Sequence, residues 1–306
     1  MYTEADFRRR PKTRAPEILR TDLAEAALRI LAFGSPLKNL MLPDMPSAAM
    51  IAQAERLLSA LGIVDRAGQL TEMGKRAAKL PLHPRLAVML AAVPSEDTAL
   101  LAAMLSERDA MRVTGAMATD LEIRFQSLKR FVESGEVPSG ADRRALEAIA
   151  RVFKHLRHSG SMGQSVASAL LFAYPDRVCM NRGPGASEPG SFLMRNGRGI
   201  YTEKSDWLAE SEFIVAVDLS GAEKSAKLRL GLSLSREQVL AHFADEIEMR
   251  HEVREANGKA RSFEQKCLGA IVLSEKETAL PEGFSEKLVL QKIRDNGIEN
   301  LVGDEA

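Results

Sequence analysis

The sequence predicts a multi-domain α+β protein, and three observations support this fold class. From Leu23 to His158 apolar residues recur at helical spacing, interrupted by one short hairpin signal. After Gly160 the pattern changes to short apolar runs separated by loops, which is typical of a small β domain. The dipeptide Asn196-Gly197 joins two of these runs, and it accepts the positive φ that a two-residue hairpin turn requires.

The composition is that of an ordinary folded chain of 306 residues. Apolar residues make up 45% and charged residues 27%, which excludes a disordered or low-complexity protein. No run of about 18 apolar residues is present, and the N-terminus lacks the apolar core of a signal peptide. Two cysteines, Cys179 and Cys267, are too few for a disulfide framework or a four-cysteine zinc site. We therefore expect a cytoplasmic protein without membrane contact.

The formal net charge of zero conceals an asymmetry along the chain. Residues 1–158 carry 24 Lys and Arg against 19 Asp and Glu, a balance of +5. Residues 159–306 carry 18 against 23, a balance of −5. A split of this kind indicates modules with different partners.

The N-terminal elements predict a winged-helix module over residues 23–83, preceded by an entry segment at 1–22. Thr21 and Ser47 are the predicted N-caps of two helices, because a Ser or Thr hydroxyl accepts a hydrogen bond from a free backbone N–H. The expected elements are these two helices, a short hairpin and a third helix, at residues 21–34, 47–61, 63–71 and 72–80. Helices followed by a small hairpin are typical of a winged helix.

Residues 84–158 predict a helical bundle, and residues 159–276 predict one helix followed by a small β-barrel of the OB type. Three apolar stripes mark the bundle, at residues 86–93, 121–132 and 146–156. The helix and the strands of the second part are expected at residues 165–173, 192–201, 213–219, 226–234 and 267–274. Residues 242–254 fit either a helix or a strand.

The chain carries no recognisable catalytic, cofactor or metal site. No phosphate-binding loop is present, since neither Gly-Lys pair is followed by Ser or Thr. His155 and His158 share a helical face but have no third ligand nearby in sequence, so a solvated pair is favoured over a metal site. We therefore expect the chain by itself neither to bind nor to hydrolyse ATP.

Five segments resemble the C-terminal region of DEAH-box helicases. Residues 15–24 (APEILRTDLA) are similar to the segment that enters the winged helix in that family. Residues 70–90 (LTEMGKRAAKLPLHPRLAVML) are similar to the wing, its following helix and the start of the helical ratchet. Residues 105–109 (LSERD), 174–178 (YPDRV) and 196–199 (NGRG) resemble the bacterial HrpB-type members specifically.

In that family two RecA-like motor domains precede a winged helix, a helical ratchet bundle and an OB-type barrel. The resemblance implies that this chain is the C-terminal part of a longer helicase. The implied modules are a motor remnant and linker, the winged helix, the ratchet, the barrel and the start of a C-terminal extension, at residues 1–22, 23–83, 84–158, 159–276 and 277–306. ATP and Mg²⁺ would bind only in the missing motor domains, so no cofactor is implied in this chain.

The resemblance also implies a partner, single-stranded RNA or DNA, which this region would guide past the motor domains in cis. Phosphate contacts need basic side chains, and residues 124–157 hold eight Lys and Arg against four Asp and Glu. The candidate nucleic-acid-binding residues are Arg124, Arg130, Arg143, Arg144, Arg151, Arg182, Arg195 and Arg198. Arg20 is implied to dock the winged helix on the motor, and the alternative for Arg20 is an ion pair with Asp22 or Glu25.

Other interpretations stay open. The basic residues also fit ordinary solvated helix faces. Phe192, Tyr201 and Trp207 are the candidates for base stacking, although Phe192 and Tyr201 fit barrel packing better. A stand-alone protein-docking module without nucleic-acid binding is one alternative function. A winged-helix DNA-binding regulator is another, but it needs a donor-rich recognition helix, and residues 47–61 are mostly apolar.

Overall fold

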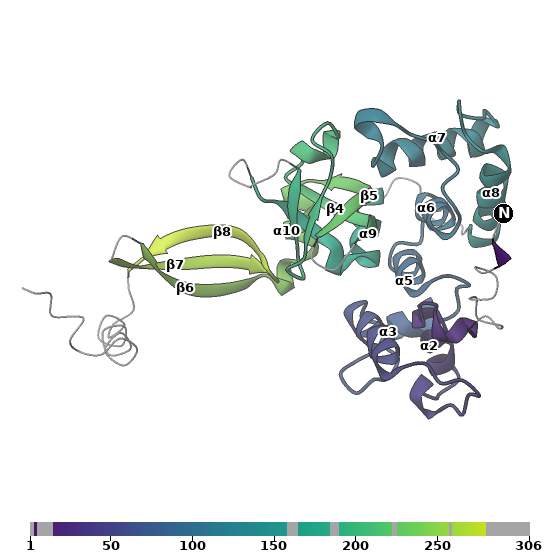
Figure 1. Cartoon of the computed structure of the whole chain (residues 1–306), viewed down its shortest axis with the longest axis horizontal. Coiled ribbons are helices and arrows are strands. Elements are labelled where there is room, and N and C mark those ends of the chain that lie inside the picture. The colour runs from purple at the N-terminus through teal and green to yellow at the C-terminus, as the bar shows by residue number, and fades with distance from the viewer. Residues whose placement is uncertain are drawn as a thin grey trace, which may run out of the picture.

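The computed structural model describes residues 3–4, 15–157, 165–183, 190–221, 225–256 and 259–279. Most of the expected motor remnant and linker at residues 1–22, and nearly all of the expected C-terminal extension, lie outside these residues. The described chain is a mixed α+β structure, in which a winged helix and a helical bundle precede a β-barrel and a projecting sheet (Figure 1).

The winged helix contains three α-helices: α2 (Ala24–Ala32), α3 (Ala48–Ala60) and α4 (Glu72–Ala77). The predicted cap at Ser47 is confirmed, because its hydroxyl accepts a hydrogen bond from the backbone N–H of Met50. The cap predicted at Thr21 is wrong. Helix α2 begins only at Ala24, whose N–H donates to the carboxylate of Asp22 at 2.7 Å.

Gly74 allows α4 to lie directly against the wing. The wing is a single antiparallel bridge between Val64 and Leu70. A Cβ placed on Gly74 would lie 2.2 Å from the backbone oxygen of Ile63 and 3.0 Å from the side chain of Leu70. Only a residue without a side chain permits this approach.

We expect Gly74→Ala to lower the free energy of unfolding by about 1–3 kcal/mol, because the clash is with backbone that cannot rotate away. In an unhindered helix the same change raises the free energy of unfolding by at most about 1 kcal/mol, because alanine has the higher helix propensity. The sign of the measured change therefore tests the contact. Urea denaturation measures it, with Lys75→Ala in the exposed part of α4 as the control. A Gly74→Ala protein as stable as the wild type would contradict this packing.

The helical bundle contains five α-helices: α5 (Pro84–Ala92), α6 (Glu96–Ser106), α7 (Leu121–Ser134), α8 (Arg143–Leu156) and α9 (Val166–Ala173). Helix α5 is central, since every residue from Pro84 to Leu90 is buried and the helix contacts α4, α6 and α9. The predicted apolar stripes face this core, where Leu121, Phe125 and Leu128 of α7 are buried. Proline is in place at the first turn of α5, where its missing N–H costs no helical hydrogen bond.

The barrel is closed and has five strands: β1 (Val178–Asn181), β2 (Ser191–Met194), β3 (Gly199–Tyr201), β4 (Phe213–Ser220) and β5 (Ser225–Leu234). The strand order is β1-β2-β3-β5-β4, with β3 and β5 parallel and the other neighbours antiparallel. The hairpin predicted at Asn196-Gly197 is confirmed, and Gly197 has a φ of +87°. Its turn is not the expected two-residue one, because the N–H of Gly197 donates to the backbone oxygen of Met194 at 2.8 Å, which makes Arg195 and Asn196 the central residues. Phe192 and Ile214 belong to the barrel's own buried core.

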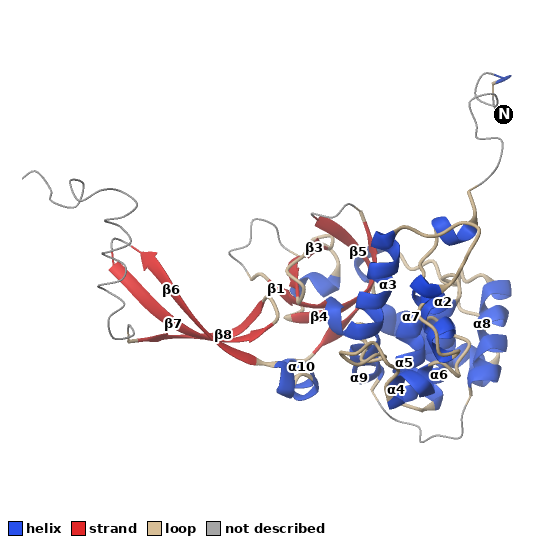
Figure 2. Cartoon of the chain, turned by 90° about the horizontal axis from the view of Figure 1, so that it is seen from below, coloured by secondary structure: helices blue, strands red, loops and turns tan. Residues whose placement is uncertain are grey.

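The strand expected at residues 267–274 does not belong to the barrel. Strands β6 (Glu248–Ala256), β7 (Lys259–Leu268) and β8 (Ile271–Thr278) form a separate antiparallel sheet that projects away from it (Figures 1 and 2). The physical reason is that β1–β5 already close the barrel and leave no edge to pair with. Residues 242–254, which fitted either a helix or a strand, are mostly strand: α10 (Arg236–His242) ends at their first residue, a 3-10 turn spans Ala244–Glu246, and β6 begins at Glu248.

Candidate nucleic-acid interface

An open cleft of about 820 Å³ lies where the winged helix, the helical bundle and the barrel meet. It is lined from α3 (Gln53, Arg56), the start of α5 (His83, Arg85), the end of α6 (Leu105), the turn after α9 (Tyr174, Asp176, Arg177), the β2–β3 turn (Asn196, Arg198) and the end of β4 (Val217, Asp218). All five segments that resemble DEAH-box helicases, residues 15–24 through Asp22, therefore contribute side chains to one cavity.

Arg85 and Asp176 form the rigid part of this cleft. The guanidinium of Arg85 donates two hydrogen bonds to the Asp176 carboxylate, at 2.7 and 2.9 Å, and one to the backbone oxygen of Ala173 at 2.8 Å. Burial opposes ionisation of Asp176, but the Arg85 hydrogen bonds and charge outweigh it and lower the pKa of that carboxyl. The pair fixes the start of α5 against the turn that follows α9.

The ring of Tyr174 lines the cleft and contacts two cations. The guanidinium carbons of Arg85 and Arg177 lie 5.1 and 5.4 Å from its centroid. Arg177 also donates to the backbone oxygen of Val217 at 2.9 Å, which ties the turn to the barrel. Burial and the nearby Arg85 lower the pKa of Arg177, but a guanidinium remains charged at neutral pH.

The cleft has an excess of positive charge. Arg85 and Asp176 neutralise each other, and burial lowers the pKa of His83, so the imidazole is uncharged at pH 7. The cleft is also lined by the guanidinium groups of Arg56, Arg177 and Arg198 and by the carboxylates of Asp22 and Asp218. A cleft of this charge and openness suits a phosphate group that remains partly hydrated.

Among the eight predicted nucleic-acid-binding arginines, all of which are described, only Arg198 lines this cleft. Arg56 and Arg177 were missed. Arg177 lies in the YPDRV segment at residues 174–178. That segment supported the family resemblance, but the positive charge of its arginine was not considered. Arg56 stands in a mostly apolar helix and has no comparable signal.

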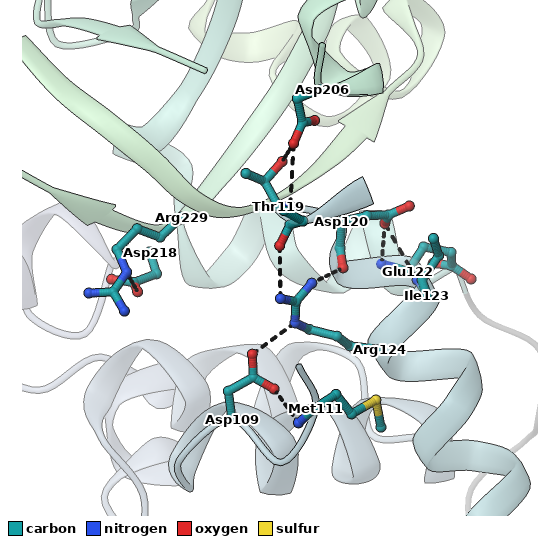
Figure 3. Close-up of polar contacts among 11 residues, drawn as sticks. Asp109, Met111, Thr119, Asp120, Glu122, Ile123, Arg124, Asp206, Asp218 and Arg229 are labelled. Atoms are coloured by element: carbon teal, nitrogen blue, oxygen red, sulfur yellow. Dashed lines mark hydrogen bonds and ion pairs between the residues drawn. The ribbon is translucent and has the colours of Figure 1, made fainter. Parts of the chain in front are cut away.

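Arg124 is wrong as a phosphate contact, because it is buried. Its guanidinium donates to the Asp109 carboxylate at 2.9 Å and to the backbone oxygens of Asp120 and Ala118 at 2.7 and 2.8 Å (Figure 3). The side chain is only 8% exposed. Arg124 therefore stabilises the start of α7.

The segment before α7 also joins the bundle to the barrel. The hydroxyl of Thr119 donates to the Asp206 carboxylate at 2.8 Å, and the backbone oxygen of Thr119 accepts from the N–H of Gly231 at 2.9 Å. Thr119, Asp120 and Asp206 are all buried. Figure 3 shows the contacts from Asp206 through Thr119 and Arg124 to Asp109 as one column, and we call this column together with the Gly231 hydrogen bond the joint.

The remaining barrel candidates have different roles. Arg195 pairs with Glu246 and lies 4.9 Å from the centroid of the Phe243 ring, so it braces the barrel against the segment after α10. Arg182 is exposed just after β1. Arg20 is exposed and donates to the backbone oxygen of Ala15 at 3.2 Å, and neither alternative ion pair is formed among the described contacts.

Four predicted candidates lie on the bundle, Arg130 on α7 and Arg143, Arg144 and Arg151 on α8, and we call the three on α8 the α8 face. All four are exposed, and Arg143 pairs with Glu147 at 3.0 Å. Helix α8 lies on the side of the bundle remote from the barrel (Figures 1 and 2). The structure therefore does not bring the α8 face and the cleft together.

The described residues show neither a metal site nor a membrane span. Within them, no group of three or more His, Cys, Asp or Glu side chains is arranged to hold a metal ion. Their helices are also too short or too polar to cross a membrane.

Comparison with known proteins identifies the class of this fold. Residues 54–82 match the family described as "Helicase associated domain (HA2), winged-helix". The winged-helix part of the fold is thus similar to the helicase-associated domain. The chain is 26% identical over 298 residues to the ATP-dependent RNA helicase HrpB of Escherichia coli, covering 94% of this chain and 34% of that protein.

Other relatives and solved structures agree with this assignment. The ATP-dependent RNA helicase HrpA homolog of Haemophilus influenzae is 37% identical over 98 residues, which are 29% of this chain and 8% of that protein. A crystal structure of the E. coli DExH-box NTPase HrpB has the same fold, with a TM-score of 0.70 and 23% identity, and the match covers 97% of this chain and 35% of that one. This chain is homologous to the C-terminal region of the HrpB-type DEAH-box helicases, and it spans about a third of the length of HrpB.

Proposed function

We propose that this chain forms the RNA-engaging and motor-docking region of an ATP-dependent DEAH-box helicase. The bundle acts as the ratchet, the closed barrel is of the OB type, and both guide single-stranded RNA past RecA-like domains in cis. Arg20, exposed at the entry to the winged helix, contributes to docking on those domains. The relative HrpB is named an ATP-dependent RNA helicase, which supports RNA as the partner.

The observation that carries the proposal is the convergence of the family-like segments on the cleft. The pairs His83 and Arg85, Asp176 and Arg177, and Asn196 and Arg198 are far apart in sequence, yet all line one cavity, which holds four arginines against three aspartates. Arg56, Arg177 and Arg198 bind RNA phosphates there. The contacts are independent of base sequence because phosphates carry no sequence information.

Binding of a fluorescent single-stranded RNA to the whole chain tests this function. We expect Arg56→Ala/Arg177→Gln/Arg198→Ala to bind about 10- to 100-fold more weakly near 0.1 M salt. Its salt slope should fall by about 2, since each phosphate contact to a single strand contributes about 0.7. The matched control is Arg143→Ala/Arg144→Ala/Arg151→Ala, which removes three charges from the α8 face.

The two triple variants separate the possible outcomes. Weakening by the α8 variant alone would move the interface to the α8 face and contradict the cleft assignment. No RNA binding by the wild-type chain would contradict the proposed function and favour the protein-docking alternative.

A further inference from the structure

A second hollow, of about 500 Å³, lies between the bundle and the barrel, and we call it the Trp207 slot. It is lined by Asp97, Glu122, Phe125, Gln126, Ser165, Val166, Ala167, Trp207, Leu232 and Ser233. Figure 3 shows Glu122 on one side of the joint and the pair of Asp218 with Arg229 on the other. The cleft lined by Arg56, Arg177 and Arg198 is called the arginine cleft below. The slot shares no lining residue with it, so the slot is a separate site.

Trp207 is held in place by its neighbours while its own ring stays accessible. Asp206 accepts hydrogen bonds from the backbone N–H of Leu208 at 3.0 Å and from the hydroxyl of Thr119 at 2.8 Å. Leu208 is fully buried, but Trp207 is 41% exposed. An exposed indole on an anchored backbone provides a stacking surface with little further ordering cost.

The polar lining of the slot is neutral or acidic. Among the described residues, none that lines it is Lys or Arg. The carboxylate of Asp97 accepts a hydrogen bond from Lys129 at 2.8 Å, and one oxygen of Glu122 accepts from the amide nitrogen of Gln126 at 2.7 Å. The second oxygen of Glu122 and the amide oxygen of Gln126 remain as acceptors. Such a site repels phosphate and suits an uncharged planar group that carries N–H donors.

We propose that the Trp207 slot binds one unstacked nucleobase of the RNA strand, and that it favours bases with an exocyclic amino group. The base stacks on Trp207 and donates its amino hydrogens to Glu122 or Gln126. Adenine and cytosine present such donors, whereas the corresponding group of uracil is an acceptor. This inference rests on the proposed function, because it places a base of the same strand whose phosphates bind the arginine cleft.

Trp207 is the single tryptophan of the chain, so its fluorescence reports directly on this site. We expect oligo(A) and oligo(C) to quench the emission of the wild-type chain, and oligo(U) to quench it less at equal occupancy. Trp207→Ala should weaken oligo(A) binding by about 5- to 150-fold, the range for loss of stacking on one base. Trp207→Phe should retain most of the affinity, and an RNA backbone with abasic positions should not distinguish wild type from Trp207→Ala.

A second variant isolates the choice of base. Gln126→Leu/Glu122→Gln should reduce the preference for oligo(A) over oligo(U) while leaving the salt slope unchanged, because no phosphate contact is lost. If the wild type binds RNA but its tryptophan emission and Trp207→Ala affinity do not change, the slot is overturned and the arginine cleft stands. If the wild type binds no RNA, both the slot and the proposed function are overturned.

Discussion

Replacing Arg124 with leucine is expected to lower the free energy of unfolding by about 2–4 kcal/mol, although the residue lies in the basic stretch at residues 124–157. The change removes three hydrogen bonds from a side chain that is 8% exposed. Two of the acceptors are backbone oxygens, and a buried acceptor left without a donor costs about 1–3 kcal/mol. The third, Asp109, is 51% exposed, so its carboxylate regains water and adds less.

Urea denaturation of the two arginines of α7 separates structure from surface charge. Arg130→Leu removes the same charge from an exposed position of the same helix and should change the stability by at most about 0.5 kcal/mol. Arg124→Lys should recover only part of the loss, because an ammonium cannot reach acceptors arranged for a planar guanidinium. Equal stability of the Arg124→Leu and Arg130→Leu proteins would show that the joint does not depend on Arg124.

The burial of Arg124 was readable from the sequence in principle. Leu121, Phe125 and Leu128 form the apolar stripe of α7, and Arg124 follows Leu121 by three residues and precedes Leu128 by four. Residues at these spacings share one helical face. Counting basic residues over a window ignores the face on which each one lies, and it therefore grouped a buried arginine with exposed ones.

The arginine cleft was not readable in this way. The family-like segments were found, but no local pattern shows that residues 83–85, 174–177 and 196–198 meet, because their approach depends on how the bundle packs on the barrel. Which strands pair with one another is equally hard to predict from local sequence patterns. The single strand expected at residues 267–274 in fact spans the end of β7, a turn at Gly269 and Ala270 and the start of β8, and no local pattern reveals that β1–β5 close on themselves and exclude both strands.

Breaking the pair of Arg85 and Asp176 is expected to destabilise the chain as strongly as the loss of Arg124. Asp176→Asn leaves the Arg85 guanidinium, which is 8% exposed, charged and with fewer acceptors, and we expect a loss of about 2–4 kcal/mol. Arg85→Met should cost a similar amount, because Asp176 is itself only 32% exposed. Arg143→Ala is the control, since its pair with Glu147 is largely exposed and worth at most about 0.5 kcal/mol.

A double-mutant cycle in urea tests whether the two side chains stabilise the junction through each other. The Arg85→Met/Asp176→Asn protein should lose less stability than the two single variants added together, with a coupling of about 1–3 kcal/mol. Strict additivity would mean that each residue acts through other contacts.

The same pair gives a dependence on pH with a definite sign. The pKa of Asp176 in the folded chain lies below its usual value, so its ionised form adds stability at any pH above the unfolded pKa of about 3.9. This stability is lost as the pH falls through the lower folded pKa. The difference in unfolding free energy between the wild type and Asp176→Asn should therefore be constant near neutral pH and shrink below about pH 4. A difference that stayed the same in acid would mean that Arg85 holds this turn through the backbone oxygen of Ala173 and not through the carboxylate.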